Sequence, residues 1–320
     1  MLDEASHELK TWSPFAFKEE RNLVPCNGQD SQGISPDRLS VLLMKEQLSE
    51  CSELIIQFLH EFHYLTGNLI INCFLHPEIN PSVRKVKKNS KNPYHRELQF
   101  LTHIGAVKQY NFIGEKGERE GSTIYTLTNG SRIWAAKRFA RQSLFSWDGK
   151  GAALHHPESD TKITGYVQML TQLSLNQFHI AMVIHHKCQI EICKKELEMA
   201  IPYNYYKSHG TKIYAISIRE YWRQSSVESL FNLLDSDSKY RNAYIIIITE
   251  SMNAAEQLFK KIICNCPSLS TKGTLLFIRD YSTKNAQNPL IDELAHFIDN
   301  DWTSFDICSL EMANNPPLRF

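Results

Sequence analysis

The segment 92–127 constrains the fold of this chain more than any other stretch of the sequence. Asn92-Pro93 predicts a helix start, because an Asn side chain accepts hydrogen bonds from free backbone N–H groups. A Pro at the first helical position loses no hydrogen bond of the helix, because the N–H of that position has no partner within the helix. The helix is expected to run to residue 104 and to stop at Gly105, which can adopt the left-handed conformation. Two β-rich runs, 107–112 and 122–127, then flank the polar turn 114–121.

Two more helices are predicted before this helix and hairpin. Apolar residues recur at helical spacing over 51–62, and Thr66 can cap a second helix. After the hairpin, Thr128 can cap a further helix. Three helices followed by a hairpin is the order of a winged helix, in which the third helix enters the major groove and the hairpin forms the wing. The sequence therefore predicts an α+β chain with a winged-helix DNA-binding domain over 41–145.

The distribution of charge favours a polyanionic partner, although the formal net charge of the 320 residues is zero. Residues 1–80 carry 5 Lys/Arg against 12 Asp/Glu, residues 81–150 carry 14 against 5, and residues 151–320 carry 16 against 18. The basic block coincides with the predicted winged helix, where double-stranded DNA would bind. The alternative is a solvated basic face without a partner.

Two groups of residues are expected to contact DNA. The first is the outward face of the helix at Pro93, since Leu98 and Leu101 are predicted to face inward, and Arg and Gln match the edges of guanine and adenine. This first group consists of His95, Arg96, Gln99 and His103. The second group is suited to phosphates and consists of Arg84, Lys85, Lys87, Lys88, Lys91 and, at the tip of the hairpin, Arg119. Plain exposure to solvent is the alternative for every one of them.

Other features narrow the class of protein. Residues 1–40 lack sustained periodicity and are expected to form a flexible N-terminal arm. The eight cysteines contain no C-x-x-C pair and lie mostly in apolar runs, which indicates reduced residues and a cytoplasmic protein. The G-x-x-x-x-G-K-[ST] and G-x-G-x-x-G motifs are missing from the sequence, so no cofactor is expected. The longest strongly apolar run, 244–248, is too short to span a bilayer, so no membrane insertion is expected.

A linker is predicted over 146–160, and a second domain over 161–320. Helices are expected at 175–186, around 227–234, at 253–263 and at 291–298, and strands at 189–193, 212–218, 243–249 and 274–278. Tyr203, Tyr205 and Tyr206 are expected in a loop after Pro202. This alternation is typical of an α/β domain with a mixed sheet.

The order of these elements resembles the replication-relaxation (MobC-like) family of plasmid and mobile-element proteins. The segments that carry the resemblance are 101–107, 124–130, the Ile201-Pro202 turn, 213–218 and 243–251, within roughly residues 50–285. The resemblance implies an N-terminal winged helix and a C-terminal domain with a restriction-endonuclease-like core, similar to the PD-(D/E)xK nucleases. It also implies a role in plasmid mobilisation, conjugation or replication control, with DNA-transfer or replication proteins as partners.

The expected nuclease site departs from the family pattern. Such a site needs carboxylates after the Pro turn and on the next strand, because they hold the divalent metal that activates the attacking oxygen. Here Tyr203 follows the Pro turn. The residues Ser217-Ile218-Arg219 take the place of the E-x-K pattern. Glu220 is one residue out of register and should face the other side of the strand. We therefore expect a degenerate site, with no carboxylate beside Ser217, no metal and no catalysis.

Two other functions stay open at this stage. The chain could be an active DNA-nicking relaxase or nuclease whose site residues lie at other positions than those named above. Separately, one of the three tyrosines could attack a phosphodiester, although tyrosine clusters in loops more often serve packing or binding. It could also be a protein-interaction scaffold in a DNA-transfer complex, since many winged helices bind proteins. The working hypothesis is a non-catalytic protein that recognises double-stranded DNA.

Overall fold

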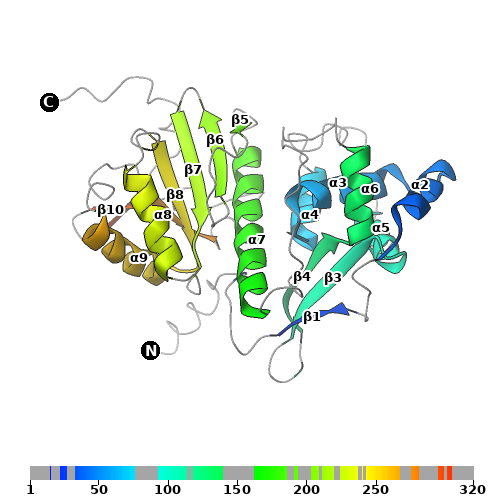
Figure 1. The fold of residues 1–320 in the computed structure, drawn as a ribbon, viewed down its shortest axis with the longest axis horizontal. Helices are drawn as coiled ribbons and strands as arrows, with labels where there is room; N and C mark the ends of the chain where they lie inside the picture. The colour runs from blue at the N-terminus through cyan, green and yellow to red at the C-terminus, as the bar shows by residue number, and fades with distance from the viewer. Residues whose placement is uncertain are drawn as a thin grey trace. The chain divides into compact units, whose positions relative to one another are not determined.

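The computed structural model has a mixed α+β fold and divides into two compact units (Figure 1). The N-terminal unit is 18–166, and the C-terminal unit combines 167–320 with 1–17. The structure describes residues 15, 22–26, 33–75, 93–113, 117, 119–139, 162–185, 191–193, 203–208, 211–219, 224–236, 240, 243–266, 275–280, 295–298 and 301–304.

The described part of the N-terminal unit combines helices with a four-stranded antiparallel sheet. Its helices are α2 (Pro36–Met44), α3 (Glu50–Phe62), α4 (Gly67–Leu75), α5 (Pro93–His103) and α6 (Asn129–Arg138). The strands, in sheet order, are β1 (Asn22–Pro25), β3 (Val107–Ile113), β4 (Arg119–Leu127) and β2 (Leu65–Thr66). Along the chain the order is therefore α3, β2, α4, α5 and the β3–β4 hairpin.

Local signals explain where these helices begin and end. The Thr66 hydroxyl accepts from the N–H of Leu69 at 3.3 Å and so caps α4, as the sequence predicts. Helix α5 begins at Pro93, also as predicted. Gly105 follows its end with a φ of 75°, a conformation that a residue with a Cβ rarely adopts.

Aromatic side chains join three helices of this unit into one core. Phe58 of α3 meets Phe74 of α4 edge to face, with 5.1 Å between the ring centroids. On its other side Phe74 stacks on Tyr94 of α5 at 4.2 Å. Burying each large apolar side chain contributes roughly 1.5–3 kcal/mol, so this chain of contacts holds α5 firmly against α3 and α4.

The predicted N-terminal arm contains regular structure. Within residues 1–40, which we expected to be irregular, β1 pairs with β3 so that Leu23 lies opposite Phe112. Helix α2 begins at Pro36, before the expected boundary at residue 40. The missed signal is Ser35 directly before Pro36, because the Ser35 hydroxyl caps α2 by accepting from the N–H of Arg38 at 3.3 Å.

The residues before α2 dock against the junction between α5 and α6. The N–H of Ile34 donates to the carbonyl of Gly105 at 2.9 Å. Gly130, in the first turn of α6, approaches the Ile34 carbonyl so closely that an added Cβ would overlap the oxygen. The Thr128 hydroxyl precedes α6 but donates to the Gly105 carbonyl at 2.9 Å instead of capping the helix.

The C-terminal unit contains a mixed seven-stranded sheet. In sheet order its strands are β11 (Asp301–Ser304), β10 (Ala295–Ile298), β9 (Leu275–Arg279), β8 (Ala243–Thr249), β7 (Thr211–Ser217), β6 (Tyr203–Ser208) and β5 (Glu191–Cys193). Strands β7, β8 and β9 are parallel, and the outer pairs are antiparallel.

Helices cover both faces of this sheet, which gives three layers (Figure 1). Helices α8 (Gln224–Ser236) and α9 (Met252–Asn265) pack on one face, where Phe231 and Phe259 contact a core that includes Ile247. Helix α7 (Lys162–His185) packs on the other face, where Phe178 meets Ile246. A central strand buried on both sides explains why 243–249 is apolar almost throughout.

Three local predictions for this unit are wrong. Tyr203, Tyr205 and Tyr206 lie on strand β6 and not in a loop. Within the expected helix at 291–298, the described residues 295–298 form strand β10, which pairs with β11 so that Ile298 lies opposite Asp301. Helix α7 begins at Lys162, well before the expected start at residue 175. The first two errors have the same cause: a short strand is stabilised by its partner strand, which no local pattern reveals.

Candidate nucleic-acid interface

Helix α5 presents one buried and one exposed face, as its sequence predicts. Tyr94, Leu98 and Leu101 are buried against the rest of the unit. The exposed side chains are those expected to contact DNA, namely His95, Arg96, Gln99 and His103. The face carries one cation, one amide and two imidazoles, and all four groups can donate hydrogen bonds to base edges or phosphates.

Helix α5 is also fixed in rotation by a carboxylate. Glu97 Oε2 accepts from the hydroxyls of Ser49 and Ser52, each at 2.7 Å, at the N-terminus of α3. A carboxylate is favoured there by the helix dipole, so Glu97 docks α5 onto α3 and turns the exposed face outward. Burial, together with Glu97, raises the pKa of the nearby Cys51 thiol to about 12, so this thiol stays protonated at neutral pH.

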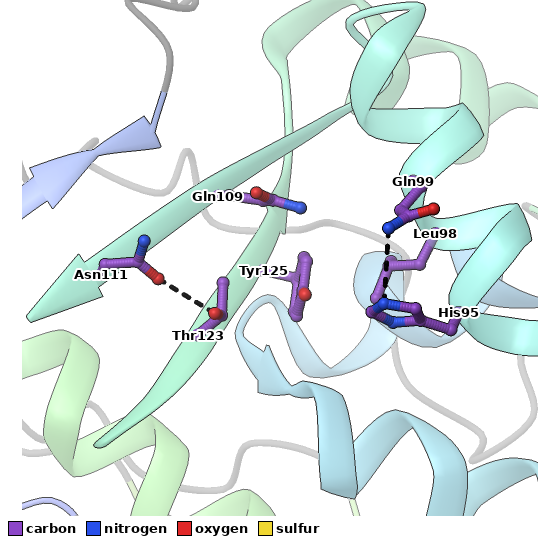
Figure 2. A pocket seen from close by; sticks show the side chains of 7 residues that line it. All are labelled: His95, Leu98, Gln99, Gln109, Asn111, Thr123 and Tyr125. Carbon is purple, nitrogen blue, oxygen red and sulfur yellow. Dashed lines mark hydrogen bonds between the residues drawn. The ribbon is translucent and has the colours of Figure 1, made fainter. Parts of the chain in front are cut away.

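A pocket of about 270 Å³ lies between α5 and the β3–β4 hairpin (Figure 2). Figure 2 shows side chains of the hairpin and of α5 around it. The hairpin supplies Gln109, Asn111, Thr123 and Tyr125, and α5 supplies His95, Leu98 and Gln99. Because side chains alternate along a strand, Gln109 and Asn111 share the face of β3 that is turned towards α5.

Hydrogen bonds set the orientation of the polar groups in this pocket. The Thr123 hydroxyl donates to Asn111 Oδ1 at 2.9 Å, across the hairpin. Gln109 Nε2 donates to the Thr102 hydroxyl at 3.2 Å. On α5, the Gln99 amide nitrogen and His95 Nε2 are 3.4 Å apart. The pocket therefore has walls of ordered amides and hydroxyls.

The other basic residues predicted to contact DNA are only partly tested. Arg84, Lys85, Lys87, Lys88 and Lys91 lie outside the described residues. Arg119 is the first residue of β4 and pairs with Ile113 at the end of the hairpin nearest its tip.

Not every basic residue of 81–150 is available to a polyanion. Lys108 is buried, with its Nζ 5.3 Å from the centroid of the Tyr110 ring. Arg138 is exposed but pairs with Glu53 at 3.1 Å. The count of basic residues in this segment therefore overstates the positive charge at the surface.

In the C-terminal unit, Ser217 and Arg219 belong to a buried charged cluster at the carboxyl ends of the parallel strands. Arg219 Nη1 lies 2.6 Å from Asp280 Oδ2 and 3.6 Å from Glu250 Oε1. Arg219 Nη2 donates to the Ser217 hydroxyl at 2.9 Å. Gln177 of α7 donates to the backbone carbonyl of Asp280. We call Ser217, Arg219, Glu250 and Asp280 the Arg219 cluster.

The expectation that no carboxylate lies beside Ser217 is wrong. Glu250 directly follows β8, which pairs with β7, and Asp280 directly follows β9, which pairs with β8. This placement is a signal that the sequence contained, because parallel strands end at the same edge of a sheet. The Arg219 guanidinium contacts both carboxylates and supplies positive charge to them.

The remaining residues of the predicted nuclease-like site are Tyr203 and Glu220. Tyr203 lies at the start of β6, opposite Ile216. Glu220 lies outside the described residues. Within the part of the chain that the structure describes, no group of three or more His, Cys, Asp or Glu side chains is arranged to hold a metal ion.

Comparison with models of known protein families, with curated proteins and with solved structures finds no match for this chain. Among the residues that the structure describes, no helix has both the length and the apolar character needed to cross a bilayer. What the chain does must therefore follow from the residues and contacts described above.

Proposed function

We propose that the N-terminal unit is a winged-helix domain that binds double-stranded DNA. The order α3, β2, α4, α5 and the β3–β4 hairpin, with β2 paired to β4, supports this proposal. In this arrangement α5 is the recognition helix and the hairpin is the wing. Strand β1 adds a further strand to the outer edge of β3.

One observation carries the proposal: α5 exposes four hydrogen-bonding side chains on a single face while its apolar side chains are buried. Arg96 and Gln99 are suited to reading guanine and adenine in the major groove. Glu97 is the only acidic residue of α5, and its side chain is turned towards α3. Its carboxylate therefore does not repel phosphates from the exposed face. His95 and His103 lie on the same face and can bind bases or backbone oxygens.

We further propose that the C-terminal unit is a nuclease-like body without catalytic activity. Its order of a helix, an antiparallel β5–β6–β7 meander, a helix and a parallel strand supports a restriction-endonuclease-like core. The buried guanidinium of Arg219 neutralises the acidic side chains at the strand ends. This body would dock a partner protein or hold the DNA, which fits a role in mobilisation or replication of a mobile element.

A second candidate function, DNA nicking, is favoured by the convergence of Glu250 and Asp280. Two carboxylates at the ends of adjacent strands are a usual starting point for a magnesium site. Against this candidate, both side chains are at least nine-tenths buried, and Arg219 already supplies a positive charge to them. We therefore place DNA binding first.

Selection of bound fragments from a pool of randomised duplex DNA tests the proposed function. The full chain should enrich a defined sequence, and its affinity for that sequence should fall steeply between about 50 and 200 mM salt, because several Lys and Arg contacts to phosphate release counterions. A protein-interaction scaffold would enrich no sequence. Incubating the selected DNA with Mg²⁺ or Mn²⁺ in the same experiment would reveal cleavage by the second candidate function.

A further inference from the structure

The pocket between α5 and the β3–β4 hairpin shares His95 and Gln99 with the exposed face of α5. Its volume of about 270 Å³ lies just below the ~300 Å³ at which small-molecule pockets begin. A single planar ring system fits this space, whereas a dinucleotide or a folded peptide does not.

The lining of the pocket favours an uncharged ligand. The described residues that line the pocket include no Lys, Arg, Asp or Glu. Their titratable side chains are His95 and Tyr125. A phosphate would find no fixed positive charge there, and a metal ion would find no carboxylate. The walls are instead amides and hydroxyls, which pair with neutral donors and acceptors.

The internal hydrogen bonds leave one donor and one acceptor ready on β3. Asn111 Oδ1 is engaged by Thr123, so the Asn111 amino group remains to donate. Gln109 Nε2 is engaged by Thr102, so Gln109 Oε1 remains to accept. Figure 2 shows both amides on the hairpin strand that faces α5. The edge of a nucleobase carries both acceptors and donors, which are the groups that these two amides bind.

We infer that this pocket receives a single unpaired nucleobase of the DNA held by α5. The inference rests on the proposed DNA-binding function and adds the kind of DNA that is preferred: a duplex with a bulged or otherwise extrahelical base beside the recognised sequence. Removing a base from a regular stack costs free energy, and a base that is already unpaired avoids that cost. A protein with such a pocket therefore selects distorted sites over perfectly paired ones.

The test compares two duplexes with the sequence recovered by selection, one fully paired and one with a single bulged 2-aminopurine. The wild-type chain should bind the bulged duplex about tenfold more tightly, and the 2-aminopurine fluorescence should change on binding. The double variant N111L/T123V removes both partners of the pocket hydrogen bond at nearly constant volume. It should bind both duplexes equally and leave the fluorescence unchanged. Ser122→Ala, at an exposed position next to Thr123, is the matched control and should keep the preference.

The outcomes separate the two proposals. If the wild-type chain binds the two duplexes with equal affinity, or if N111L/T123V keeps the preference with an unchanged melting temperature, the pocket does not hold the base and this inference is overturned while the proposed function stands. If the wild-type chain binds neither duplex, the proposed function is overturned and this inference falls with it.

Discussion

Arg219 and Asp280, which are 61 positions apart in the sequence, form a 2.6 Å ion pair with both side chains essentially inaccessible to solvent. The pair joins the end of β7 to the end of β9 across the central strand β8. A buried charge is strongly destabilising once its partner is removed, because the remaining charge has neither water nor a counterion. The Arg219 cluster is therefore expected to be highly sensitive to substitution.

Breaking this pair should destabilise the chain severely. Arg219→Ala and Asp280→Asn are each expected to lower the free energy of unfolding of the C-terminal unit by about 3–5 kcal/mol. Denaturant titration followed by circular dichroism measures the loss. Lys260→Ala is the matched control: it breaks a Lys260–Glu256 pair of equal length, 2.6 Å, on the exposed surface of α9, and should change stability by less than about 0.5 kcal/mol. Equal effects of the buried and exposed substitutions would contradict the structural role of the cluster.

The same cluster predicts the outcome of a nicking assay. The wild-type chain should leave supercoiled plasmid intact in the presence of Mg²⁺ or Mn²⁺, because the Glu250 and Asp280 carboxylates are buried beside a guanidinium. Agarose gel separation of supercoiled and open-circular plasmid measures the reaction. Metal-dependent nicking that disappears in Glu250→Gln or in Glu220→Ala would show that the C-terminal unit is an enzyme.

His179, on the sheet-packed helix α7, makes stability depend on pH. Burial lowers the pKa of His179 from 6.5 to about 4 in the folded chain, so the unfolded chain binds a proton more readily. The contribution of His179 to stability is thus complete above pH 6.5 and is lost progressively as the pH falls from 6.5 towards 4. Between pH 7.5 and pH 5 the wild-type chain should lose about 2 kcal/mol more than His179→Gln. Parallel curves for the two proteins in urea titrations at these pH values would refute the assignment.

The close approach of Gly130 to Ile34 predicts a second site of instability, in the N-terminal unit. Gly130→Ala should destabilise this unit by about 1–3 kcal/mol, because the new methyl group would overlap a backbone oxygen that cannot rotate away. Gly67→Ala, in the first turn of α4, places its Cβ 3.6 Å from the nearest atom, Tyr125 Cε2, and should be neutral or slightly stabilising. Thermal melts of the two variants give the comparison. A Gly130→Ala protein as stable as Gly67→Ala would mean that the residues before α2 are not docked at this junction.

Local signals in the sequence predicted α5 and its surroundings well. The Pro93 start, the Gly105 stop and the Thr66 cap each depend on residues within one helical turn, so one sequence is enough to find them. The exposed face of α5 followed from the same helical spacing. By contrast, β1 and β10 exist because distant strands pair with them, and their own residues give little sign of it.

The Arg219 cluster was missed for a related reason. The motif with which Ser217 and Arg219 were compared lies on one strand, whereas Arg219 contacts residues that follow two other strands. Once β7, β8 and β9 are recognised as three consecutive parallel strands, Glu250 and Asp280 are predictable as residues at the same edge as Arg219. The polar pocket beside α5 could not be predicted, because it depends on how far the hairpin stands from the helix.

Binding of the wild-type chain and Arg96→Ala to the selected duplex and to an unrelated duplex of equal length tests the central claim most directly. Arg96→Ala should weaken binding to the selected duplex by about 1–3 kcal/mol, and should change binding to the unrelated duplex much less, so that sequence preference falls. Lys137→Ala, which removes an exposed cation from α6, should keep the preference. If Arg96→Ala binds both duplexes as the wild-type chain does, α5 is not the recognition helix and the proposed function is wrong.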